Sequence, residues 1–79
     1  MNLFLKHEVK ENDGRYEAIL FLNKKNVDHL NENVFHLAIK KEALSYVKSK
    51  FTSVPIEVVR IMIGSFLYFS FAVNIKRDV

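Results

Sequence analysis

The stretch from Ile56 to Val73 constrains this chain more than any other, because neither side of the ribbon it would form is polar. It is rich in β-branched and aromatic residues, which favour strands, and Gly64-Ser65 at its middle suits a type II′ hairpin turn. An antiparallel hairpin on a protein surface normally alternates apolar and polar residues, so that one face can meet water. Here each face carries large apolar side chains, and we expect both to be covered.

Pairing outward from this turn predicts the register of the C-terminal hairpin. On one face the predicted pairs are Ile63 with Phe66, Ile61 with Tyr68, Val59 with Ser70 and Glu57 with Ala72; on the other they are Met62 with Leu67, Arg60 with Phe69, Val58 with Phe71 and Ile56 with Val73. A single helix can cover one face. Because monomers rarely expose apolar patches beyond roughly a few hundred Å², we expect a second copy to cover the other.

A second hairpin is predicted near the N-terminus, over residues 2–23. Asp13-Gly14 suits a type I′ turn, in which both central residues need positive φ. The predicted partners are Val9 with Ala18, His7 with Leu20, Leu5 with Leu22, and Lys10 with Glu17. The last pair is of opposite charge, which supports this register.

The segment between the hairpins is predicted to form an amphipathic helix. Apolar residues recur there at helical spacing, at Leu30, Val34, Leu37, Leu44, Val47 and Phe51. Its start is ambiguous, because Asp28, Asn31 and Asn33 are all acceptable N-caps. An alternative makes Val34–Ile39 a short strand and starts the helix near Lys40. Pro55 follows the expected end of the helix, which proline cannot continue.

These elements predict a single α+β domain over residues 1–79, arranged β-hairpin–helix–β-hairpin. Its sheet would be mainly antiparallel, with the one amphipathic helix packed on it. A chain of 79 residues buries only about 60% of its unfolded surface, so its margin of stability is thin. It has no cysteine for a disulfide, which leaves packing and a partner chain as the stabilising devices.

No residue pattern indicates catalysis, a cofactor or a metal site. His7, His29 and His36 are scattered, and the last two are seven residues apart, whereas helical zinc motifs place histidines at i and i+4. Gly14 and Gly64 are turn residues, and no Ser-His-Asp set or glycine-rich phosphate loop is present. We therefore expect a protein that is not an enzyme and has no cofactor.

Glu57 and Arg60 are charges within an otherwise apolar strand, three residues apart and so on opposite faces. Either they contact a second subunit, since buried charge needs a partner, or they lie near a solvated strand end. The residues predicted to form the interface are Arg60, Met62, Phe66, Tyr68, Phe69 and Phe71. The expected function is a structural protein that self-associates into a homo-oligomer or filament through this hairpin.

Two other functions stay open. A net charge of +3, with lysines at 24–25, 40–41, 48 and 50, permits a nucleic-acid-binding or regulatory module, in which the aromatics would stack on bases. A lysine run is more often the solvated side of a helix. A membrane-associated protein is the other alternative, but the apolar run after Arg60 is shorter than the roughly 20 residues that a spanning helix needs.

The N-terminal residues Met1–Glu8 bring charges too early for a secretory signal, so a cytoplasmic location is the default expectation. The segment Tyr46-Val47-Lys48, Phe51, Val54-Pro55-Ile56 and Val59–Gly64 resembles one in small, uncharacterised proteins of spore-forming Bacillus-type bacteria. There a helix ending in Tyr-Val/Ile-x-x-x-Phe precedes a Val-Arg/Lys-Ile-Met-x-Gly strand. The resemblance covers about the last third of the chain and implies a sporulation or cell-envelope setting.

Overall fold

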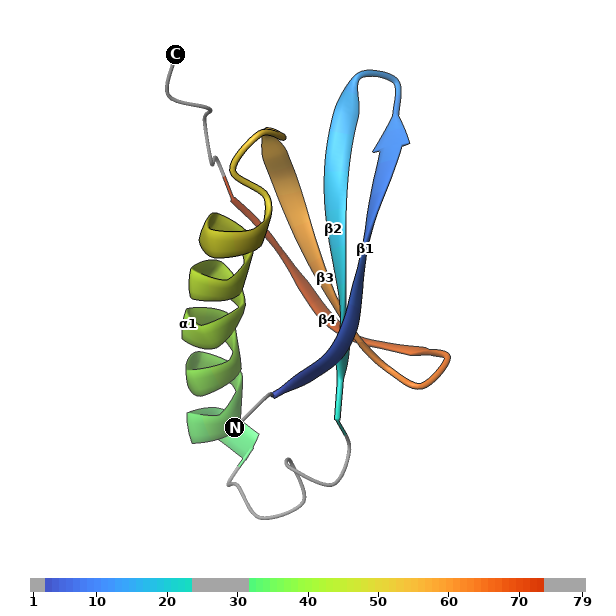
Figure 1. The fold of residues 1–79 in the computed structure, drawn as a ribbon. Coiled ribbons are helices and arrows are strands. Elements are labelled where there is room, and N and C mark those ends of the chain that lie inside the picture. Colours follow the sequence, from blue (N-terminus) through green and yellow to red (C-terminus); the bar gives the residue numbers. More distant parts are fainter. Residues whose placement is uncertain (1–2, 24–31, 74–79) are drawn as a thin grey trace.

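A computed structural model describes residues 3–23 and 32–73, with the side chains of residues 32–35 outside that description. One helix lies across one face of a four-stranded sheet (Figure 1). The elements in chain order are β1 (Phe4–Asn12), β2 (Arg15–Leu22), α1 (Glu32–Lys50), β3 (Ile56–Ile63) and β4 (Phe66–Ala72). The α+β arrangement of hairpin, helix and hairpin is therefore confirmed.

The strands lie in the order β1-β2-β3-β4. Within each hairpin the pairing is antiparallel, whereas β2 and β3, which join the two hairpins, are parallel. Parallel neighbours need a long crossover connection, and α1 lies within it (Figure 1). In the described part of the chain, β1 and β4 are consequently the two edges of the sheet.

The N-terminal hairpin has the predicted turn, since φ is 53° at Asp13 and 78° at Gly14. The predicted pairs from Lys10–Glu17 through His7–Leu20 are confirmed, but the pairing of Leu5 with Leu22 is wrong. A bulge at Leu5 pairs Phe4 with Leu22 instead. Because a bulge adds one residue to one strand and re-aims its neighbours, Phe4 is buried and Leu5 is 68% exposed.

The C-terminal hairpin turns at Gly64, where φ is 59°. Its first two pairs, Ile63 with Phe66 and Met62 with Leu67, are as predicted. Beyond them the predicted register is wrong, because Tyr68 is an extra residue in β4. The observed partners are Ile61 with Phe69, Arg60 with Ser70, Val59 with Phe71 and Val58 with Ala72.

Helix α1 spans Glu32–Lys50, so the alternative strand over Val34–Ile39 is wrong. Asn33 lies inside the helix, while Asp28, Leu30 and Asn31 lie outside the described residues. The helix ends where predicted, with the N–H of Phe51 donating to the carbonyl of Val47 at 2.9 Å.

The face of α1 that meets the sheet differs from the predicted one. Its buried residues are Ile39, Ala43 and Val47, spaced four apart, as expected for one face of a helix. Leu37, which was expected in that face, is 73% exposed. The periodicity marks a helix correctly, but the apolar residues on α1 occupy more than one side.

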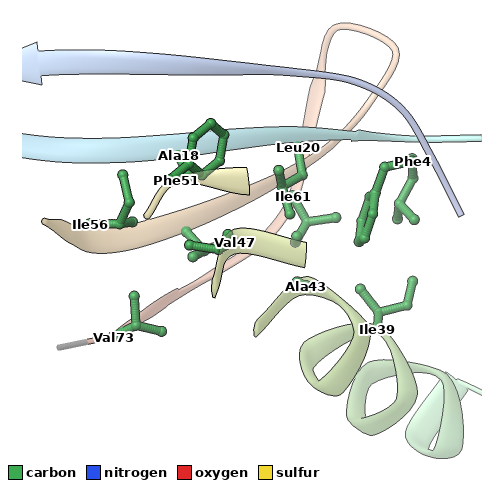
Figure 2. Packing of buried hydrophobic residues seen from close by; sticks show 12 residues of the cluster. Phe4, Ala18, Leu20, Ile39, Ala43, Val47, Phe51, Ile56, Ile61 and Val73 are labelled. Carbon is green, nitrogen blue, oxygen red and sulfur yellow. The ribbon is translucent and has the colours of Figure 1, made fainter. Parts of the chain in front are cut away.

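The core lies between α1 and the two inner strands (Figure 2). Five inner-strand side chains are fully buried there: Ala18, Leu20, Ile56, Val59 and Ile61. The rest of the buried cluster consists of Phe4, Leu22, Ile39, Ala43, Val47, Phe51 and Val73. No buried residue of the described chain is polar or charged, so the core is held by apolar packing.

Candidate association surface

The sheet face opposite α1 has no covering element in the described part of the chain (Figure 1). Directly opposite residues on neighbouring strands share a face, and one complete row runs Glu8, Ile19, Arg60 and Ser70 from edge to edge. By alternation the whole open face consists of Lys6, Glu8, Lys10, Asn12, Arg15, Glu17, Ile19, Phe21, Val58, Arg60, Met62, Leu67, Ser70 and Ala72.

The open face has an apolar group of side chains toward the β3–β4 turn, and this group is incompletely shielded. Ile19, Phe21 and Met62 are half-buried, and Leu67 is 52% exposed. The Lys6 ammonium lies 4.5 Å from the centroid of the Phe21 ring, where a cation is attracted by the aromatic face and its alkyl stem covers apolar surface. Shielding of this kind is found on the β1 side of the face.

Glu57 and Arg60 each have an ion-pair partner within the chain. The Nε of Arg60 lies 3.2 Å from a carboxylate oxygen of Glu17, and the Nε of Arg15 lies 3.7 Å from one of Glu57. Both partners come from β2. Sequence reasoning missed these pairs because nothing in the sequence placed β2 beside β3.

The six predicted interface residues do not share one surface. Arg60 and Met62 lie on the open face, and Phe66 lies beside the β3–β4 turn with 80% of its surface exposed.

Tyr68, Phe69 and Phe71 are turned instead toward α1. The Tyr68 ring stacks on His36 with centroids 4.9 Å apart, and Phe69 meets the same histidine edge-on at 5.1 Å. The Lys40 ammonium lies 5.5 Å from the Phe71 ring centroid. All three aromatics are half-buried, which makes them a poor exposed platform for stacked bases.

The histidines that the structure describes have aromatic neighbours. His7 shares a hydrogen bond of 2.5 Å with the Tyr46 hydroxyl, and His36 one of 3.3 Å with that of Tyr68. His29 lies outside the described residues. Within residues 3–23 and 32–73, no cluster of three or more His, Asp and Glu residues could hold a metal ion.

The two edge strands differ in charge, and the sequence analysis did not identify this difference. Strand β4 contains no charged residue and no proline among its seven residues, whereas β1 has Lys6, Glu8, Lys10 and Glu11. An edge strand exposes unpaired backbone groups, and proteins usually protect it with charges or proline. The signal was present in the sequence, but its meaning depends on knowing which strands are edges.

Within the described residues, no helix is both long and apolar enough to span a membrane. No finding bears on the resemblance to proteins of Bacillus-type bacteria, which stays a prediction. Comparison of the chain with family models, curated proteins and solved structures found no match.

Proposed function

We propose that this chain is a non-enzymatic structural protein that self-associates through its C-terminal hairpin, β3–β4. The observation that carries the proposal is the uncharged edge strand β4, which continues a sheet whose open face is apolar toward the β3–β4 turn. A strand edge of this kind favours pairing with another strand.

Backbone pairing alone is insufficient for a stable assembly. A hydrogen bond contributes about 1 kcal/mol net, so four of them give about 4 kcal/mol, whereas a micromolar dissociation constant requires about 8 kcal/mol. Burial of apolar side chains at roughly 1.5–3 kcal/mol each must supply the difference. The C-terminal hairpin has such side chains, including Phe66 and Leu67, which are largely exposed in a single copy.

Light scattering over a range of protein concentrations tests the proposal. The chain has a mass of 9.3 kDa, and we expect the measured mass to be a multiple of that value and to fall on dilution. A protein that remains at the monomer mass at high concentration contradicts self-association.

A pair of lysine substitutions locates the surface. Leu67→Lys adds a charge to the open face of the hairpin and should shift the protein toward monomer. Leu37→Lys is the matched control, because Leu37 is an exposed leucine of α1, which packs on the opposite face of the sheet. If both substitutions leave the mass unchanged, the open face around Leu67 is not in the contact; if Leu37→Lys alone reduces the mass, the C-terminal hairpin is not the contact.

The same samples test the alternative of a nucleic-acid-binding module. Helix α1 exposes Lys40, Lys41, Lys48 and Lys50, so a DNA or RNA titration at two salt concentrations is informative. Steep salt-dependent binding by a protein that stays monomeric would replace the structural function with this one.

A further inference from the structure

We infer that the assembly is a closed two-fold dimer in which β4 pairs antiparallel with β4 of a second copy, centred on Phe71. The inference rests on the proposed self-association and specifies its partner, edge and register. It also decides between a closed oligomer and a filament, which the sequence leaves open.

The choice of β4 follows from the charges of the two edges. A β1–β4 contact between copies would bring Lys6, Glu8, Lys10 and Glu11 against a strand with no countercharge. A β1–β1 contact would bring these charges against their own copies. Only β4 against β4 brings no charged strand residue into the contact, so a second copy of β4 is the partner that suits this edge.

The outward backbone groups of β4 can be assigned from a backbone hydrogen bond just beyond the end of this strand. The N–H of Val73 donates to the carbonyl of Glu57 at 2.7 Å, toward β3. Backbone groups of an antiparallel strand alternate between its two sides, and the register is regular from Phe69 onward. The N–H and C=O of Ser70 and Ala72 therefore point away from β3, toward the open edge.

These groups fix the register of a symmetric pair. The bulge at Tyr68 interrupts the regular strand, so the length available for pairing begins at Phe69. With the two-fold axis at Phe71, Ser70 of each copy pairs with Ala72 of the other, and all the assigned outward groups find partners. An axis at Ser70 would instead place Ala72 opposite the bulged Tyr68.

Residues at the axis are well suited to this contact. Phe71 would face Phe71 of the second copy as a non-hydrogen-bonded pair, the type with the closer side chains, and cross-strand aromatic pairs stabilise sheets. Ser70 and Ala72 are small and exposed, so they do not hinder the approach of the two strands.

This geometry closes the assembly at two copies. A two-fold contact uses the same surface of each subunit and leaves no free copy of it. The outer edges of the resulting eight-stranded sheet are the two β1 strands, where the charges oppose further growth. A dimer is therefore expected rather than a filament.

Single cysteines test the register cleanly, because the chain has none of its own. Opposed Cα atoms in a non-hydrogen-bonded pair are about 4.5 Å apart, within the range of a disulfide. We expect Phe71→Cys to form a covalent dimer on mild oxidation. The control is Glu8→Cys, on the charged edge at the β1 end of the row that ends in Ser70; it should crosslink at least about tenfold more slowly, since only chance collisions join it.

A second measurement avoids the half-buried Phe71. The exposed variants Ser70→Cys and Ala72→Cys should crosslink efficiently when mixed and poorly when each is alone, because each residue faces the other type across the axis. This decides the register even if Phe71→Cys does not fold.

The outcomes separate this inference from the proposed function. A monomer in light scattering overturns both. A multimer in which the mixed variants do not crosslink, or in which Glu8→Cys crosslinks as fast as they do, retains self-association and overturns the β4–β4 dimer. A mass that grows without limit contradicts closure.

Discussion

The two edge strands of this sheet differ in almost every property that controls association. Strand β1 has alternating lysine and glutamate residues, and all of its residues after Phe4 are exposed. Strand β4 has no charge, and three of its four aromatics, Tyr68, Phe69 and Phe71, are partly buried against α1. The two edges of one sheet therefore differ in the charges that protect an edge strand from pairing with another strand.

The helix explains part of this asymmetry. Its first half lies against β4, where His36 contacts Phe69, and its last turns lie against β1, where Tyr46 contacts Phe4. Each edge is thus anchored to α1 over part of its length. Beyond its anchor β1 is solvated and charged, whereas β4 remains apolar up to the turn, with Phe66 and Leu67 exposed.

The largest effect is expected from removing the protection of β1. Replacing Lys6, Glu8, Lys10 and Glu11 with threonine removes two charges of each sign and leaves the net charge at +3. Both edges would then be uncharged, and we expect open-ended assemblies in place of a closed dimer. Light scattering would show a mass that rises with time and concentration.

The control for this variant keeps the charges and changes the side chains. Lys6→Arg, Glu8→Asp, Lys10→Arg and Glu11→Asp should leave the mass as it is in the original protein. If the threonine variant also keeps that mass, the charges of β1 are not what limits growth of the sheet.

The second effect concerns how β1 is anchored. Phe4 is 7% exposed and packs on Tyr46 with ring centroids 5.3 Å apart, so Phe4→Ala should lower the free energy of unfolding by about 3–5 kcal/mol. Phe66 is 80% exposed, and Phe66→Ala should change that free energy by less than about 0.5 kcal/mol. Urea unfolding of dilute protein measures both.

Equal losses for the two alanine variants would contradict the assignment of Phe4, rather than Phe66, to the core. A Phe66→Ala loss that appears only at high protein concentration would instead place Phe66 in the contact between copies.

The turns and the elements of this fold could be predicted from the sequence because their causes are local. Asp13-Gly14 and Gly64 adopt positive φ, which few other residues do readily. The termination of α1 before Pro55 is equally local. The α+β arrangement followed from these signals together with strand propensity.

The two bulges and the neighbour relation between β2 and β3 could not be predicted in this way. The bulges at Leu5 and Tyr68 each change which side chains of their strand face the helix. Where a bulge forms depends on which of the neighbouring side chains fits the core. The same limit applies to Tyr68, Phe69 and Phe71. They were predicted at the interface because the sequence did not show that they would face α1. Ser70 and Ala72 were not predicted as interface residues, because the groups that they place along the open edge are backbone N–H and C=O groups rather than side chains.

The smallest effect is expected from the ion pair of Arg60 and Glu17, which joins the two hairpins where β2 meets β3. A double-mutant cycle with Arg60→Ala and Glu17→Ala should give a coupling of roughly 0.2–1 kcal/mol, since the Arg60 side chain is half exposed to water. The pair of Arg15 and Glu57 is longer and more exposed, and its coupling should be near zero. A coupling above this range for Arg60, present only in the assembled protein, would return Arg60 to the interface where the sequence had placed it. A coupling of the predicted size in the monomer shows that Glu17 already satisfies the charge of Arg60 within a single copy.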